Sequence, residues 1–319
     1  METQVSVITC SHNPREDYLK QVLNALKNQT LAKHYWEYLL IDNASDEPLE
    51  TRIDLSWHSN ARHVREEKLG LTTARLRGIR EAAGGLLVFV DDDNVLDADF
   101  LEETLNIARA WPTLGAWSGQ TRPGFEIQPP EWTKRYWGSL VIRGLERDSW
   151  SSLPHLPETM PCGAGLCVRR NVAAHYARLH ESGKRKFILD RIGDSLVSAG
   201  DNDLAACACD LQLGVGLFVA LKLTHLIPAS RLDEKYLLRL VEGIAFSGVI
   251  FRSLRSPSLS YHQRRVTRIA DLARQLFMSQ RDRRFFRAHK RGESRAVQYL
   301  ADHSQRHQVK SISQEQAAV

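Results

Sequence analysis

Short apolar segments and amphipathic segments take turns at the start of the chain. Residues 4–10, 38–41 and 86–90 are β-branched or continuously apolar and are bounded by turn-forming residues, which is typical of buried strands. Between them, residues 15–28 and 71–83 carry apolar side chains at helical spacing. The order strand, helix, strand, helix, strand predicts an α/β fold with a Rossmann-type, mostly parallel sheet that has helices on both faces.

The pattern changes in the middle of the chain. Residues 111–161 hold five of the seven tryptophans together with several prolines and glycines, which indicates loop-rich structure with large aromatic faces. Strand-like and helix-like segments resume at 160–168 and 201–221, and a helix is predicted over 236–251. A C-terminal helical extension with a basic helix is predicted from apolar residues at i, i+3, i+4 spacing: Val266, Ile269, Ala270, Ala273, Leu276 and Phe277.

Polar residues stand at the end of each of the three predicted strands. Ser11-His12-Asn13 follows the first, Asp42-Asn43 ends the second and Asp91-Asp92-Asp93 follows the third. Ligands of parallel sheets bind beyond the carboxyl ends of the strands. We therefore expect the three groups to meet around one ligand.

The three adjacent aspartates indicate a cation site. Carboxylates this close repel one another, and folding gains nothing from the arrangement. In an extended segment Asp91 and Asp93 point to the same side, where both can reach one hard cation such as Mg²⁺ or Mn²⁺ that keeps positions open for phosphate oxygens. The alternative is an acidic turn that caps the next helix, which is predicted to begin near Ala98.

Three other residues near the strand ends have two interpretations each. Asp42 is placed to accept hydrogen bonds from a base or a ribose, or else it closes an Asx-turn. Arg75 on the second predicted helix binds a carboxylate or phosphate, or else it is an ordinary surface arginine. His12 stacks on a flat base, or else its hydrogen bonds are satisfied within its loop.

The net charge of +5 is unevenly distributed. Residues 252–295 contain 13 Lys and Arg against three acidic residues, so the rest of the chain is mildly acidic. A tail this basic favours an anionic surface, membrane lipid or nucleic acid, although a solvated helix face explains it equally well. Phe285 and Phe286 stand among three arginines and are predicted to dip into a membrane interface.

Composition and missing motifs exclude several classes. With 43% hydrophobic and 25% charged residues, the chain is neither disordered as a whole nor a disulfide-dense mini-protein. Five cysteines without a C-x-x-C pair indicate a reducing compartment. We find no signal-like leader and no apolar stretch of about 18 residues, so a cytoplasmic protein is expected. The first strand is not followed by the G-x-G-x-x-G that hydride transfer needs.

Several segments, in this order and spacing, are also found in one known family. They are VSVITCSHN (5–13), LIDNASD (40–46), GLTTARLRGI (70–79), VFVDDD (88–93) and GDNDL (200–204). With them the chain resembles the family 2 glycosyltransferases, which are inverting enzymes with a GT-A fold that use nucleotide-sugar donors. The resemblance covers roughly residues 4–240 and implies a GT-A-like sheet with helices on both faces.

The resemblance implies how the donor is bound. Asp91 and Asp93 would hold Mn²⁺ or Mg²⁺ on the donor diphosphate, and the downstream His225 would complete the metal site. Asp92 would touch the ribose or the metal, and Asp42 the nucleobase. The whole donor-binding set is Ser11, His12, Asn13, Asp42, Arg75, Asp91 and Asp92.

The resemblance also implies a catalytic base. The family has a Glu-Asp pair where this chain has Gly200-Asp201, which leaves Asp201 and Asp203 as rival candidates. Asp201 is preferred because it stands at the start of a predicted helix that can aim it rigidly. The alternative for either residue is a helix cap.

Residues for the acceptor are predicted in the loop-rich region and just after it. Trp132 and Trp137 are candidates to stack on the apolar faces of an acceptor sugar, although core packing explains each of them singly. Gly163 and Gly165 allow a substrate to approach the backbone closely.

Together these assignments predict an enzyme with three regions. Residues 1–125 form the nucleotide-sugar-binding half, 126–235 the acceptor-binding half and 236–319 a basic helical extension. The resemblance implies transfer from a UDP-sugar to a saccharide acceptor, lipid-linked acceptors included, in bacterial surface-polysaccharide synthesis. It places residues 252–295 on the inner face of the plasma membrane, and nucleic acid is not the expected partner. The alternatives are a nucleotidyltransferase that makes a nucleotide sugar, and a non-catalytic protein that binds anionic polymers through the tail.

Overall fold

The computed structural model divides the chain into two compact units. Unit 1 comprises Met1–Asp194 and Gly200–Asp233, and unit 2 comprises Ser195–Ala199 and Glu234–Val319. The structure describes residues 3–154, 156–185, 189–190, 196–255, 271 and 274–316, with side chains described as far as residue 302. The two units are described separately below.

Over the described residues, the strands of unit 1 form one nine-stranded sheet. Its order is β3-β2-β1-β4-β8-β6-β9-β5, and β7 pairs with β9 beside this path. The strands are β1 (Val5–Ser11), β2 (Trp36–Asn43), β3 (Ala61–Glu66), β4 (Leu86–Phe89), β5 (Asn94–Leu96), β6 (Leu114–Phe125), β7 (Ser149–Ser151), β8 (Leu166–Arg169) and β9 (Gly214–Ile227).

The longest ladders of the sheet are parallel. β1 pairs in parallel with both β2 and β4, β2 with β3, and β6 with β9. The shorter ladders that β8, β5 and β7 make are antiparallel. The predicted mixed, mostly parallel α/β sheet is therefore confirmed.

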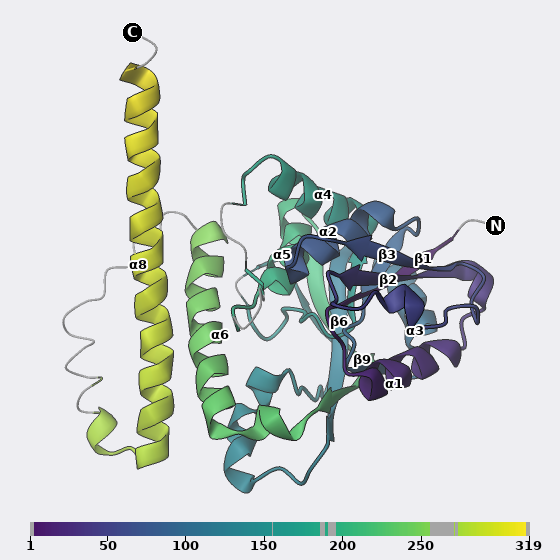
Figure 1. Cartoon of the computed structure of the whole chain (residues 1–319), viewed down its shortest axis with the longest axis horizontal. Helices are drawn as coiled ribbons and strands as arrows, with labels where there is room; N and C mark the ends of the chain where they lie inside the picture. Colours follow the sequence, from purple (N-terminus) through teal and green to yellow (C-terminus); the bar gives the residue numbers. More distant parts are fainter. Residues whose placement is uncertain are drawn as a thin grey trace. The chain divides into compact units, whose positions relative to one another are not determined.

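Helices cover both faces of this sheet (Figure 1). One layer consists of α2, α4 and α5, in which α4 contacts both of its neighbours, and the other contains α1 and α3. The helices of unit 1 are α1 (Glu16–Lys27), α2 (Leu71–Glu81), α3 (Phe100–Ala110), α4 (Arg170–Glu181) and α5 (Gly200–Asp210), with short 3₁₀ helices η1 (Lys33–Tyr35), η2 (Leu49–Thr51), η3 (Glu131–Leu140) and η4 (Ala229–Leu232).

These elements form where apolar residues have the matching spacing. The buried face of α1 consists of Tyr18, Leu19, Val22, Leu23 and Leu26. All eight residues of β2 are buried, as expected for an inner strand of a sheet that is covered on both faces.

The structure adds to or refines the sequence analysis at three places. β3 was not predicted, because this edge strand carries charged residues such as Arg62 and Arg65 that can reach solvent. The helix predicted to begin near Ala98 begins at Phe100. The segment Asp91–Asp93 is a turn rather than an extended segment, because the Asn94 N–H donates to the Asp91 carbonyl at 3.0 Å.

Unit 2 contains a pair of long helices, α6 (Glu234–Arg255) and α8 (Gln280–Gln316), that contact each other. Basic residues of α8 bind acidic residues of α6 in four ion pairs: Arg281–Glu234, Arg284–Glu234, Arg291–Glu242 and Arg295–Glu242. Part of the basic tail is therefore neutralised within unit 2. Among the described residues, no helix is both long enough and apolar enough to cross a bilayer.

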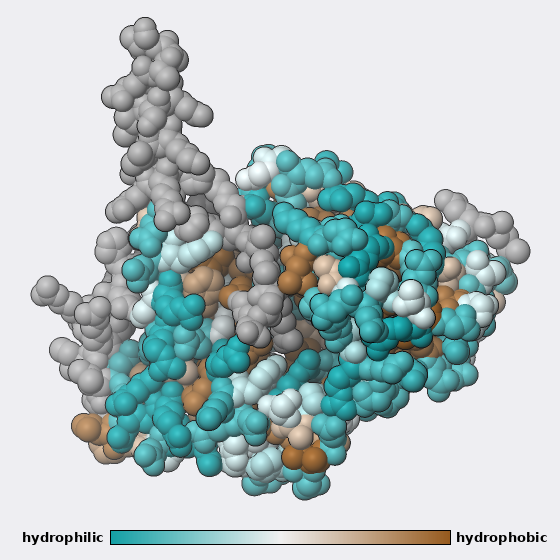
Figure 2. Space-filling view, viewed as in Figure 1, coloured by the Kyte–Doolittle hydropathy of each residue, from teal (hydrophilic) through white to brown (hydrophobic). Residues whose placement is uncertain are grey.

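The apolar residues of the tail do not lie where the sequence predicted. Phe285 is only 4% exposed, so the prediction that it dips into a membrane is wrong. Leu276 and Phe277, just before α8, are 78% and 91% exposed. Figure 2 shows apolar atoms at this end of the helix pair, at the lower left. Val266, Ile269, Ala270 and Ala273 of the predicted basic helix lie outside the described residues.

Candidate active site

The acidic turn Asp91–Asp93 links β4 to β5 at the carboxyl end of β4. The Ser11 hydroxyl at the end of β1 donates a hydrogen bond to the Asp92 carboxylate. Asp93 is buried, and its Oδ1 accepts a hydrogen bond from the Asn94 side-chain amide at 2.8 Å. Two of the three predicted strand ends are thus in direct contact.

The acidic turn is electrostatically unfavourable without a cation. Burial, and then the nearby Asp93 carboxylate, raise the pKa of Asp92 to about 7. The same two causes raise the pKa of Asp91. Because both carboxyl groups are costly to ionise in this position, a bound cation would stabilise their charged forms.

His225 on β9 faces this turn. Its Nε2 lies 3.3 Å from Asp93 Oδ2, and its Nδ1 lies 3.0 Å from the Leu140 carbonyl oxygen. Since a carbonyl only accepts, Nδ1 carries a proton and donates it to Leu140, and Nε2 is directed at the turn. A metal-binding histidine has the same arrangement, with its other nitrogen held by a backbone carbonyl.

Arg231 of η4 lies against the same two side chains. Its Nη1 is 2.9 Å from Asp93 Oδ2 and 2.9 Å from His225 Nε2. A cationic group therefore already contacts the pair that the sequence assigned to a metal. Arg231 was not predicted, because an isolated arginine several residues after a histidine gives no local signal.

The donor atoms fit a hard divalent cation. Two ligands at right angles on an octahedral Mg²⁺ or Mn²⁺ are about 3 Å apart, close to the Asp93–His225 separation of 3.3 Å. Asp91 offers a further carboxylate from the same turn, but its oxygens do not lie within 4.8 Å of both of these donor atoms. Among the described residues, three other ligating side chains have all their donor atoms within 4.8 Å of one another: His175, Cys207 and Asp210. They lie at the end of α5 that is away from Asp201.

Arg75 lies at the core of a second charged group. It is buried on α2 and binds Asp190, with Nη1 2.9 Å from Oδ2, and Thr72 donates to the same carboxylate at 2.9 Å. Burial alone would lower the pKa of Arg75, but the charges of Asp190, Asp201 and Asp91 raise it above its usual value. Arg75 is therefore not an ordinary surface arginine, and Asp190, which the sequence analysis missed, is its partner.

Asp201 and Asp203 have different surroundings at the start of α5. Asp201 is half-buried, and its Oδ2 accepts the Gly163 N–H at 2.5 Å. Asp203 is buried and binds Arg185 Nε at 2.7 Å. A Cβ on Gly163 would lie 3.1 Å from both Arg75 Nη2 and Asp201 Oδ2. Asp201 therefore lies next to Arg75, while Asp203 has the half-buried Arg185 as its partner.

The ends of β1 and β2 are held together by hydrogen bonds. His12 Nδ1 lies 2.9 Å from the Asn43 carbonyl oxygen, and the Asn13 N–H donates to Ser45 Oγ at 3.0 Å. Asn13 has a positive φ of 47°, which an Asn in a tight loop tolerates. All three predicted strand ends are thus brought together, and the His12 side chain is exposed.

Asp42 is buried and makes several local hydrogen bonds. Its carboxylate accepts from the Ser45 and Leu49 N–H groups at 3.0 Å each and from Arg65 Nη1 at 2.7 Å. Burial raises its pKa, but these hydrogen bonds outweigh burial and lower it. Asp42 therefore holds its own loop together, as the alternative interpretation had it, but through N–H groups three and seven residues on rather than through an Asx-turn.

The predicted acceptor residues lie in unit 1. Trp132 and Trp137 are half-buried on η3, and Trp137 packs 5.0 Å from the Phe125 ring centroid. Gly163 contacts Asp201 as described above. Gly165 has φ +65° and packs so closely that a Cβ would lie 2.8 Å from both Phe100 and Leu223. Packing and backbone conformation therefore account for this glycine without a substrate.

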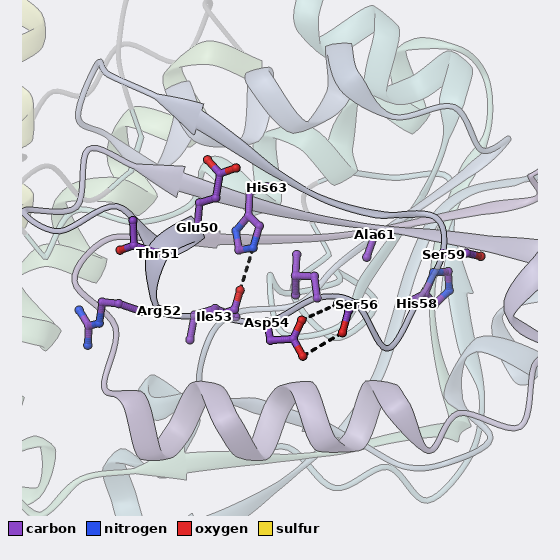
Figure 3. A pocket seen from close by; sticks show the side chains of 11 residues that line it. Glu50, Thr51, Arg52, Ile53, Asp54, Ser56, His58, Ser59, Ala61 and His63 are labelled. Carbon is purple, nitrogen blue, oxygen red and sulfur yellow. Dashed lines mark hydrogen bonds between the residues drawn. The ribbon is translucent and has the colours of Figure 1, made fainter.

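A pocket of about 640 Å³ lies between η2 and the start of β3 (Figure 3). There the Asp54 carboxylate accepts hydrogen bonds from Ser56, and His63 Nε2 donates a hydrogen bond to the Ile53 carbonyl. Because β2 and β3 are parallel, the pocket is at the opposite end of β3 from Asp42 and Asn43. The predicted site residues are not among the described residues that line it, so we assign it no part in the candidate site.

Comparison with known structures identifies the fold. Crystalline S. aureus TarS 1-349 in complex with UDP-GlcNAc superimposes with a TM-score of 0.52 at 13% identity, over 90% of this chain and 79% of that one. A longer TarS structure gives a TM-score of 0.50 at 14% identity, over 82% of this chain and 44% of that one. The molecule thus has the fold class of GT-A glycosyltransferases, as predicted.

Sequence comparison identifies the family. The family model for glycosyl transferase family 2 matches residues 6–169, more than half of the chain, and the chain belongs to this family. Glycosyltransferase AglE of Haloferax volcanii is 30% identical over 92 residues, which are 28% of this chain and 30% of AglE. EpsH of Bacillus subtilis is 29% identical over 111 residues, 34% of this chain and 31% of EpsH. The chain thus spans under a third of the length of each of these relatives.

Proposed function

We propose that this protein is an inverting glycosyltransferase that transfers a sugar from a UDP-sugar to a saccharide acceptor during synthesis of a bacterial surface polysaccharide. The observation that carries the proposal is the acidic turn of a family 2 fold, facing the Nε2 lone pair of His225 at the carboxyl ends of the strands. TarS, which has the same fold, was crystallised with UDP-GlcNAc, which supports a UDP-sugar as the donor.

Asp91, Asp93 and His225 are the residues that would hold Mn²⁺ or Mg²⁺. When bound, such a cation neutralises charge on the diphosphate leaving group. The exposed ring of His12, held by the Asn43 carbonyl, is available for stacking on the base. Ser11 orients Asp92 next to the ribose or the cation. Arg75 adds positive charge behind the turn.

Asp201 is our choice for the general base. An acceptor hydroxyl loses its proton as it attacks the anomeric carbon, and a carboxylate within hydrogen-bond reach accepts that proton. The Gly163 N–H fixes the orientation of the Asp201 carboxylate. Asp203 is engaged by Arg185, which favours Asp201. Trp132 and Trp137 remain the candidates for stacking on the acceptor sugar.

We also propose that unit 2 binds an anionic membrane surface, as an enzyme acting on lipid-linked acceptors at the inner face of the plasma membrane would. Four of its arginines are engaged by Glu234 and Glu242, so charge alone does not carry this proposal. The support comes from exposed Leu276 and Phe277, beside the exposed Arg274, just before α8.

Nucleoside diphosphates test the donor site directly. A ligand that binds only the folded protein stabilises it, by about 2.7 kcal/mol at 100 times its Kd. We expect UDP with Mn²⁺ to raise the melting temperature of the wild-type protein by several degrees. The variant Asp93→Ala should lose this shift, and also Mn²⁺-dependent hydrolysis of the donor, while remaining folded.

The control is Asp54→Ala, which removes an exposed aspartate beside the pocket of Figure 3. It should retain the full shift. The proposal is wrong if no nucleoside diphosphate stabilises the wild type with Mn²⁺, or if Asp93→Ala behaves as wild type. Release of pyrophosphate from a sugar phosphate and a nucleoside triphosphate would instead indicate a nucleotidyltransferase.

A further inference from the structure

The position of Arg231 conflicts with simultaneous metal binding at His225. A neutral imidazole has one lone pair, on its unprotonated nitrogen. In this structure the Nδ1 proton is donated to Leu140, and Arg231 Nη1 donates to the Nε2 lone pair at 2.9 Å. That lone pair can accept the arginine N–H or bind a cation, but it cannot do both.

The same arginine also contacts the second ligand of the pair. Its Nη1 is 2.9 Å from Asp93 Oδ2, and Asp93 Oδ2 is 3.3 Å from His225 Nε2. One nitrogen thus lies equally close to both of the donor atoms that would hold a cation. Metal and guanidinium therefore compete for the pair.

Hydrogen bonds hold the backbone around Arg231, and its side chain is partly exposed. The Leu226 N–H donates to the Asp93 carbonyl at 2.8 Å, which ties the end of β9 to the acidic turn. The Ala229 N–H donates to Glu126 at 2.8 Å, and the Arg231 N–H donates to the Pro228 carbonyl at 2.9 Å. The Arg231 side chain is 22% exposed, so it has solvent on one side.

We propose that Arg231 is an exchangeable counter-ion, which neutralises Asp93 and His225 in the free protein, leaves His225 when a divalent cation binds, and then binds the donor diphosphate. The planar guanidinium with its five N–H donors suits phosphate oxygens. Its present partners, Asp93 and His225, would hold the cation, and the guanidinium would then be available to the diphosphate. This inference rests on the proposed donor site.

The proposal predicts opposite effects of one substitution on two binding steps. Without the competing guanidinium, Arg231→Gln should bind Mn²⁺ alone about tenfold more tightly than the wild type. With Mn²⁺ saturating, the same variant should bind UDP about tenfold more weakly, because one charge-assisted contact to phosphate is lost. A residue that only supports the fold would weaken both steps.

Mn²⁺ binding can be measured from the electron paramagnetic resonance signal of the free ion, and UDP binding by calorimetry. Arg62→Gln, which removes an arginine paired with Glu81 on the sheet edge, is the matched control and should change neither constant. Arg231→Lys keeps the charge and should lie between wild type and Arg231→Gln in both constants, and it replaces the Gln variant if that one does not fold.

The outcomes separate the two claims. If the wild type binds no UDP in the presence of Mn²⁺, the proposed donor site is wrong and this inference falls with it. If the wild type binds both, but the Arg231 variants bind Mn²⁺ no more tightly or bind UDP equally well, the donor site stands and the role of Arg231 as an exchangeable counter-ion is overturned.

Discussion

Asp201 and Asp203 show how two identical side chains at nearly adjacent positions acquire different chemistry. Both stand in the first turn of α5, where acidic residues are favourable. Successive positions on a helix point in different directions, so Asp201 reaches Gly163 and Asp203 reaches Arg185. One carboxylate is oriented by a neutral N–H, and the other neutralises a half-buried arginine.

Two substitutions therefore have separable effects. Asp201→Asn should lower the transfer rate by about 10²–10⁴-fold with little change in UDP binding, because it keeps the shape but removes the base. Asp203→Asn should lower the free energy of unfolding by about 3 kcal/mol, since Arg185, whose side chain is 9% exposed, loses the carboxylate that neutralises it. Steady-state rates and urea unfolding measure the two effects. A stable Asp203→Asn without transfer activity would identify Asp203 as the base instead.

The β6–β9 ladder shows how one element positions residues from distant parts of the chain. These two long parallel strands carry a register shift at Gly119 and Gln120. β9 then continues to His225, which stands opposite Asn94, directly after the acidic turn. The ladder therefore sets the position of His225 relative to Asp93. A Cβ on Gly119 would lie 2.1 Å from the Leu221 carbonyl oxygen, so only glycine fits at this shift.

Gly119→Ala should lower the free energy of unfolding by about 1–3 kcal/mol or more, because the backbone of β9 must move to accept the methyl group. Gly144→Ala is the control: a Cβ there has no atom within 4 Å among the described residues, and the change should stay within about 0.5 kcal/mol. Urea unfolding of both variants measures the difference. Equal stability of the two variants would contradict this account of the ladder.

The whole molecule combines a mildly acidic body with a basic tail, and the ion pairs between α8 and α6 lower the charge that the tail presents. Binding to a membrane then depends on both the remaining basic residues and exposed apolar residues. A basic residue near an anionic surface contributes about 1 kcal/mol, and salt screens this contribution. Burial of apolar side chains is not screened by salt in this way.

The full-length protein should co-sediment with vesicles that contain phosphatidylglycerol, and less so as salt is raised. Replacing both Leu276 and Phe277 by Ser should weaken sedimentation about tenfold, since two exposed apolar side chains no longer enter the bilayer. Ile127→Ser removes an exposed apolar residue of unit 1 and serves as the control. A protein that stays in the supernatant with anionic vesicles at low salt would exclude this membrane role.

Much of the fold could be predicted from the sequence because its signals are local. Apolar spacing predicted β1, β2, β4, α1 and α2 together with their parallel order. Strand β3 could not be predicted, since Arg62 and Arg65 on an edge strand hide the pattern of a buried strand. The aspartates of the acidic turn were also visible, because three adjacent carboxylates are conspicuous in a sequence.

The partners of those aspartates depend on contacts between distant residues. Asp190 binds Arg75 of α2, and Arg231 of η4 binds Asp93. No local sequence pattern indicates either Asp190 or Arg231. Periodicity and strand ends follow from interactions between near neighbours in the chain, so the sequence alone established the class of fold and the edge where a ligand binds. Packing of β9 against β6 and β5 decided which charges meet there, because a contact between residues far apart in the chain exists only once the sheet is assembled.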